Sequence, residues 1–190
     1  MEKIKYLALL RGLNVGGNNV IKMDRLKTLF EELHFTDVVT YIQSGNVIFN
    51  DFEEDRVKVS QKIEDALSGQ LGHKITMALL TSSEMKDVVA KRPEGFGDDR
   101  ARYKYDVLFL IAPLKPADVI KELKARADVD AICPGEKVLY ISRLTSALTK
   151  SYFSKITETS IYRNVTIRNW NTTVKLYELM NNRTGFFTET

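Results

Sequence analysis

Strand-like apolar runs and amphipathic, helix-like segments alternate along this 190-residue chain in an order that occurs twice. Each occurrence has the order strand, helix, strand, strand, helix, strand, and one more helix follows it. The first six elements have the order of the ferredoxin-like split βαβ unit, in which two helices cover one face of a four-stranded antiparallel sheet. We therefore predict an α+β protein with a duplicated ferredoxin-like architecture and antiparallel sheets.

The first half is predicted to occupy residues 1–92. Its expected elements are a strand at 4–10, a helix at 23–34, strands at 38–43 and 47–49, a helix at 53–68 and a strand at 75–80. The opening strand is apolar on both faces, which indicates that both faces of its sheet are covered. Gly69 is expected to stop the second helix, and Thr81-Ser82-Ser83-Glu84 has the pattern of a capping box that begins the extra helix.

Residues 93–104 are rich in Gly, Asp and Arg and show no periodicity, so we predict a linker there. The second half then occupies residues 105–182, and a mostly polar tail follows at 183–190. Its expected elements are a strand at 105–111, a helix at 116–127, strands at 129–133 and 138–142, a helix at 146–156, a strand at 161–168 and a helix at 170–180.

Charge and cysteine content narrow the classes of function. The 28 basic and 25 acidic residues are interleaved and give a net charge of +3, which favours a mixed solvated surface over a dense nucleic-acid-binding patch. Cys133 is the only cysteine, so an intramolecular disulfide and a cysteine-rich zinc site are excluded. No run approaches the roughly 20 apolar residues of a membrane span, and no secretory signal is evident. We expect a cytoplasmic protein without membrane contact, cofactor or metal.

The segment from Arg11 to Asn19 is a candidate binding site. It joins the first strand to the first helix, and its three glycines and three asparagines leave backbone N–H groups accessible to an anion. Arg11 adds a guanidinium that can hold phosphate or carboxylate through two hydrogen bonds. The loop has neither the Walker A nor the dinucleotide-binding pattern, and turn chemistry alone explains every residue in it except Arg11.

The split βαβ topology brings further polar residues to this end of the first sheet. The hairpin turn at Gln43–Asn46 and the start of the fourth strand at Gly72-His73 are expected to lie beside the loop. The residues predicted to bind a ligand here are Arg11, Asn14, Gly16, Gly17, Asn18, Gln43, Ser44 and Asn46.

A second polar motif, Arg168-Asn169-Trp170-Asn171-Thr172, lies where the last strand passes into the last helix. Trp170 fits an apolar helical stripe, which favours core packing, whereas Arg168, Asn169 and Asn171 fit helix caps or ligand contacts. We include Arg168, Asn169, Trp170 and Asn171 among the predicted ligand-binding residues. This motif either shares one cleft with the first site or lies apart from it.

Three motifs together resemble those of an uncharacterised bacterial family, domain of unknown function 1697. They are Ala8–Gly17 (ALLRGLNVGG), Tyr41–Val47 (YIQSGNV) and Arg168–Thr172 (RNWNT). The resemblance spans about residues 3–180 and implies an α+β protein with two ferredoxin-like halves. It implies no activity, cofactor or catalytic residue, and it favours all three polar motifs as parts of a site.

The sequence is compatible with three kinds of function. The first is binding of a small anionic or nucleotide-like ligand at the Arg11–Asn19 loop and the Gln43–Asn46 hairpin. The second is a nucleic-acid-binding module that uses Arg11, Arg163, Arg168 and Trp170. The third is a protein-interaction module with an exposed sheet edge or apolar patch. No Ser/His/Asp arrangement is evident, so the sequence assigns no catalytic residue or reaction and no oligomeric state.

Overall fold

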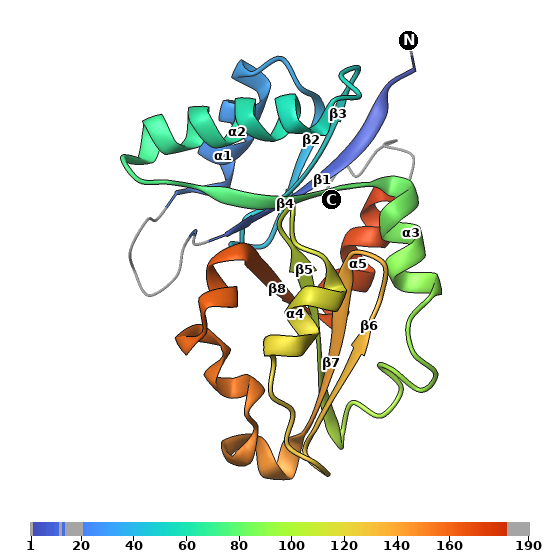
Figure 1. The fold of residues 1–190 in the computed structure, drawn as a ribbon. Coiled ribbons are helices and arrows are strands. Elements are labelled where there is room, and N and C mark those ends of the chain that lie inside the picture. The colour runs from blue at the N-terminus through green and yellow to red at the C-terminus, as the bar shows by residue number, and fades with distance from the viewer. Residues whose placement is uncertain (1, 12, 14–20, 182–190) are drawn as a thin grey trace. The chain divides into compact units, whose positions relative to one another are not determined.

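The structure of the protein is a computed structural model that describes residues 2–11, 13 and 21–181. The chain divides into two compact units. The first consists of Met1–Met85 together with Lys175–Thr190, and the second consists of Lys86–Val174. The segment 93–104, where we predicted a linker, lies inside the second unit and not at a boundary between the units. Each unit contains one four-stranded sheet (Figure 1).

The first unit has the predicted order of strands and helices. Its elements are β1 (Ile4–Arg11), α1 (Met23–Glu32), β2 (Thr36–Tyr41), β3 (Asn46–Asp51), α2 (Arg56–Leu71) and β4 (Thr76–Thr81), and α3 (Ser82–Ala90) follows them. The strands pair antiparallel in the order β2-β3-β1-β4, which is the order of the split βαβ unit. The predicted α+β fold class is confirmed.

One face of the first sheet carries the core of this unit. The helices α1 and α2 lie against it (Figure 1), and Phe30 of α1 is buried in the same cluster as Tyr6 and Phe49 of the sheet. The rings of Tyr6 and Phe49 stack with centroids 5.6 Å apart. On the opposite face Leu7 and Leu9 have no exposed surface. Burial of β1 on both faces, predicted from its continuous apolar run, is therefore confirmed.

Two helix boundaries of the first unit depend on side-chain and backbone caps. The capping box that begins α3 is confirmed, because Glu84 accepts a hydrogen bond from Thr81 N–H at 2.9 Å and Thr81 Oγ1 accepts one from Glu84 N–H at 3.4 Å. The expected stop of α2 at Gly69 is wrong. The helix continues to Leu71, and Gly72 at φ +72° takes the left-handed position that ends it.

The second unit repeats the strand order of the first, as β6-β7-β5-β8. Its elements, with the helix that leaves it, are β5 (Tyr103–Leu110), α4 (Pro116–Glu122), β6 (Asp130–Pro134), β7 (Val138–Leu144), three 3₁₀ turns η1 (Thr145–Lys150), η2 (Phe153–Glu158) and η3 (Ser160–Asn164), β8 (Val165–Asn169) and α5 (Trp170–Asn181). The helix α4 is shorter than the predicted helix at 116–127, and β8 begins later than the predicted strand at 161–168.

The predicted helix at 146–156 is wrong, because the turns η1 and η2 replace it. Residues 145–160 are rich in Ser and Thr, whose hydroxyls bond nearby backbone groups and compete with helix formation. Thr159 is an example, since its Oγ1 donates to the Ile156 carbonyl at 2.7 Å. Phe153 and Ile156 are nevertheless buried in one cluster with Val119 of α4, because a 3₁₀ turn brings residues i and i+3 to the same side.

The other face of the second sheet carries an aromatic cluster centred on Phe96. Its ring centroid lies 4.9 Å from Tyr105, 5.2 Å from Tyr140 and 5.3 Å from Trp170. The Tyr140 hydroxyl donates to the Val88 carbonyl of α3 at 2.8 Å, and burial raises the pKa of Tyr140 to about 12. The segment that we predicted as a linker thus supplies a core residue of the second unit.

Candidate functional site

The end of the first sheet brings together two of the predicted polar segments. Arg11, the last residue of β1, pairs with Thr76 of β4, and Leu10 N–H donates to the Gly45 carbonyl of the hairpin turn at 2.8 Å. Gly45 has φ +70°, and a Cβ there would lie 2.9 Å from Leu10 Cβ, so the close approach of turn and strand requires glycine. The predicted residues Asn14, Gly16, Gly17 and Asn18 lie outside the residues that the structure describes.

The hairpin turn holds its polar residues in different ways. Asn46 has no exposed surface, and its side-chain amide donates to the Tyr41 carbonyl at 2.9 Å and to Ser44 Oγ at 2.8 Å. Gln43 is exposed. Ile42 beside it is 47% exposed and has φ +47°, which is strained backbone for a β-branched residue. Asn46 therefore shapes the turn, and Gln43 is the amide that the turn exposes.

Arg168 of the second motif is a buried residue. Arg168 is only 8% exposed. Its Nη1 donates hydrogen bonds to Thr166 Oγ1 and to the Ile167 carbonyl, both at 2.8 Å. Burial lowers the pKa of Arg168 to about 10, so the guanidinium stays protonated at neutral pH. These two bonds join Arg168 to its own strand, and Arg168 is not among the residues that line the pocket beside Asn169.

Asn169 and Trp170 fix the junction between β8 and α5. Asn169 Oδ1 accepts a hydrogen bond from Thr172 N–H at 2.8 Å, which is the geometry of a helix N-cap. Trp170 is 5% exposed and packs on Gly97. A Cβ at Gly97, which has φ +94°, would overlap Trp170 Nε1 and lie 2.5 Å from Cδ1. Core packing of Trp170 and capping by Asn169 thus occur together at this junction.

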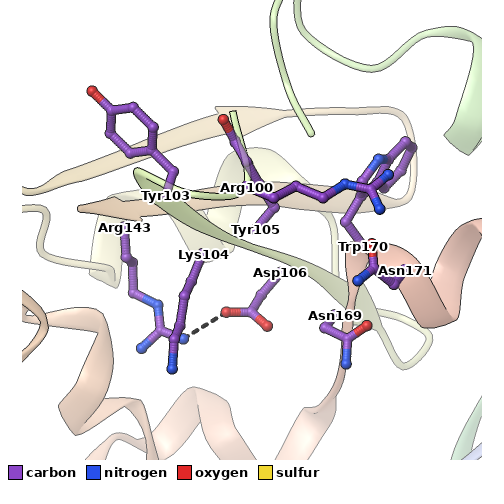
Figure 2. A pocket seen from close by; sticks show the side chains of 9 residues that line it. All are labelled: Arg100, Tyr103, Lys104, Tyr105, Asp106, Arg143, Asn169, Trp170 and Asn171. Atoms are coloured by element: carbon purple, nitrogen blue, oxygen red, sulfur yellow. Dashed lines mark hydrogen bonds and ion pairs between the residues drawn. The ribbon is translucent and has the colours of Figure 1, made fainter. Parts of the chain in front are cut away.

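A pocket with a volume of about 430 Å³ lies beside this cap (Figure 2). Its walls come from β5, from β7, from the β8–α5 junction and from the turn before β5. The lining residues are Arg100, Tyr103, Lys104, Tyr105, Asp106, Arg143, Asn169, Trp170 and Asn171. The volume falls within the roughly 300–1,000 Å³ of small-molecule sites. Three of the predicted ligand-binding residues, Asn169, Trp170 and Asn171, therefore meet at one pocket.

The pocket exists because β8 is shorter than β5. The β8 strand pairs with β5 only as far as Asp106, which lies opposite Asn169, and the chain then turns into α5. The Tyr103–Tyr105 stretch of β5 extends beyond this point and forms one wall. Lys104 and Asp106 project to one side of β5, and Tyr103 and Tyr105 project to the other (Figure 2).

Positive charge dominates this pocket. Arg100, Lys104 and Arg143 contribute three cations, against one carboxylate from Asp106. Arg143 lies opposite Lys104 in the strand register, and its Nη2 donates to Asp106 Oδ2 at 2.6 Å. The two side chains of this ion pair are 18% and 14% exposed. Arg143 Nη1 also donates to Ser154 Oγ at 3.3 Å, and its Nε is buried and has no hydrogen-bond partner in the part of the chain that the structure describes.

Comparisons with known proteins identify the family of the chain. A family model described as "Protein of unknown function (DUF1697)" matches residues 4–140. The chain belongs to the DUF1697 family. The family suggested by the three motifs is therefore confirmed, and the first two motifs lie within the matched residues.

A solved structure supports the fold of this DUF1697 protein. The chain is similar to the conserved bacterial protein SP0830 from Streptococcus pneumoniae, with a TM-score of 0.83 and 24% sequence identity over 95% of this chain and 100% of that one. This likeness confirms the two-sheet α+β fold. A search of the curated proteins finds no match. Within the described ranges, no helix is long and apolar enough to cross a membrane.

Sequence reasoning missed the charged and aromatic walls of the pocket in this DUF1697 protein. The missed residues are Arg100, Tyr103, Lys104, Tyr105, Asp106 and Arg143. The alternation of aromatic and charged residues from Tyr103 to Asp106 is a local signal for a strand with one polar side. Arg143 has no such signal, because its place opposite Lys104 depends on strand register. The described residues contain no group of three or more His, Cys, Asp or Glu that could hold a metal ion.

Proposed function

We propose that this DUF1697 protein binds a small anionic ligand in the pocket of its second unit. The observation that carries the proposal is the excess of cations, Arg100, Lys104 and Arg143 against Asp106, around a pocket of ligand size. Guanidinium and ammonium groups bind phosphate and carboxylate through charge-assisted hydrogen bonds. Asn169 supports the proposal. Its Oδ1 accepts the hydrogen bond that caps α5, so its side-chain NH₂ group can donate a hydrogen bond to an anion in the pocket.

The proposal is tested by titrating inorganic phosphate into the ¹⁵N-labelled full chain. The indole N–H of Trp170 is a single, assigned reporter, because the chain has one tryptophan. Lys104→Gln and Arg100→Gln should each weaken binding about fivefold to tenfold, since each removes a charged donor worth about 1 kcal/mol. Lys121→Gln makes the same change of charge at a side chain 75% exposed and outside the pocket, so it should leave the affinity unchanged.

Two results would contradict this function. One is that phosphate moves no resonance of the pocket in the wild-type protein. The other is that Lys121→Gln weakens binding as much as Lys104→Gln, because binding would then depend on overall charge.

The end of the first sheet is a second candidate site for the same class of ligand, at the Arg11–Asn19 loop and the Gln43–Asn46 hairpin. Its support is the pairing of Arg11 with Thr76 beside a turn that exposes Gln43. Arg11→Gln in the same titration separates the two sites. A loss of phosphate binding in Arg11→Gln but not in Lys104→Gln would assign the ligand to the first unit.

Nucleic-acid binding through Arg163, Arg168 and Trp170 has less support. Arg168 and Trp170 are 8% and 5% exposed, whereas phosphate contacts and base stacking need accessible side chains. We further propose a bacterial, cytoplasmic protein. The similarity to the bacterial protein SP0830 and the single cysteine support this placement.

A further inference from the structure

We infer that the anionic ligand also carries an aromatic ring, as a nucleoside monophosphate does, and that the ring lies against Tyr103 and Tyr105. This inference rests on the proposed function and names the class of ligand. It gives a role to Tyr103 and Tyr105, two lining residues that carry no charge. Three observations support it: the size of the pocket, the separation of its two kinds of wall, and the support behind the tyrosine rings.

The pocket is larger than a lone phosphate requires. Its volume of about 430 Å³ lies in the range of roughly 300–1,000 Å³ that is typical of sites for small organic molecules. A phosphate ion has five heavy atoms and fills a small part of this space. The ligand that fits the whole pocket therefore has a second group attached to its anion.

The chemistry of the walls indicates what that second group is. Lys104, Asp106 and Arg143 lie on one side of β5, and Tyr103 and Tyr105 lie on the other, where Arg100 lies beside Trp170 (Figure 2). The early end of β8 at Asn169 leaves β5 uncovered between them, so one molecule can contact both sides. A ligand with an anionic end and an aromatic end matches this division.

The two tyrosines are partly exposed and supported by neighbouring side chains. Their ring centroids lie 6.1 Å apart at an angle of 46°. Phe96 meets Tyr105 edge to face at 4.9 Å, and the Arg102 guanidinium lies 5.3 Å from the Tyr103 ring. Surfaces that bind nucleotides combine cations with aromatic rings that are held in place, and the bases stack on these rings.

The test compares AMP with ribose 5-phosphate, which carries the same phosphate and sugar without the base. In the wild-type protein AMP should bind at least about tenfold more tightly, which is the effect of one stacked base. Tyr105→Leu and Tyr103→Leu should each weaken AMP several-fold and leave ribose 5-phosphate unchanged. Lys104→Gln should weaken both ligands. Tyr152→Leu removes a tyrosine 47% exposed and outside the pocket, and should change neither affinity.

The outcomes separate this inference from the function on which it rests. Equal affinities for AMP and ribose 5-phosphate would overturn the aromatic ring and leave anion binding intact. Binding of neither ligand would overturn the proposed function as well. A short oligonucleotide that binds far more tightly than AMP, with an affinity that falls steeply with salt, would replace the mononucleotide by a nucleic-acid strand. If Tyr105→Leu fails to fold, Tyr103→Leu decides.

Discussion

Replacing Gly97 by alanine perturbs the packing directly behind the pocket. The added Cβ would overlap Trp170 Nε1, and it would lie 2.5 Å from Cδ1 and 3.1 Å from Cε2. Gly97 also has φ +94°. A left-handed backbone costs an L-residue about 1–2 kcal/mol, and overpacking of a core costs about 1–3 kcal/mol. We therefore expect Gly97→Ala to lower the free energy of unfolding by about 2–5 kcal/mol.

Gly95→Ala is the matched control for this substitution. Gly95 has φ +73°, but a Cβ there would meet no atom within 4 Å. It should therefore show the backbone cost of about 1–2 kcal/mol without the clash. Urea denaturation followed by the fluorescence of Trp170, the single tryptophan, measures both variants.

Equal losses of stability in Gly97→Ala and Gly95→Ala would refute the packing of Trp170 on Gly97. A double variant provides a second check. Trp170→Leu should cost less in the Gly97→Ala background than in the wild-type protein, because the indole that clashes is gone. Circular dichroism replaces fluorescence for that comparison. Additive effects would show that the two residues do not touch.

Three further substitutions, two of them paired with a control substitution, test other contacts. Asn169→Ala should cost about 1 kcal/mol of stability in urea denaturation through loss of the α5 cap, whereas the exposed Asn171→Ala should cost less than about 0.5 kcal/mol. Asn46→Ala should cost about 1–3 kcal/mol, because it removes a buried amide bonded to the Tyr41 carbonyl, and Gln43→Ala should have little effect. Burial raises the pKa of Glu64 above its ordinary value of 4.5, so its contribution to stability is present below that value and is lost as pH rises through the raised pKa. Thermal melts of Glu64→Gln should therefore show stabilisation near neutral pH that disappears below pH 4.5.

The order of strands and the fold class could be predicted because their signals are local. The continuous apolar run of β1 and the hairpin turn before Asn46 both belong to single segments of sequence, and both predictions are confirmed. The ends of the helices were harder to predict from the sequence. Gly69 and Gly72 are both plausible stops by residue type, and only the left-handed backbone at Gly72 decides between them. The helix expected at 146–156 had the right apolar spacing, but its serines and threonines favour short 3₁₀ turns.

The candidate site was predictable only in part, for a physical reason. Asn169, Trp170 and Asn171 are adjacent in sequence, so their motif stands out. Lys104 and Arg143 are distant in sequence and meet because β5 and β7 pair in one register. The pocket also depends on where β8 stops relative to β5, which follows from the cap that Asn169 provides for α5. Composition and spacing do not determine either relation.

A crystal structure of the protein with AMP tests the central claim most directly. We predict the phosphate within hydrogen-bonding distance of Lys104 Nζ, with the Arg143–Asp106 ion pair retained and the base against Tyr103 or Tyr105. AMP bound beside Arg11 and Gln43 with the pocket of the second unit empty would contradict this account.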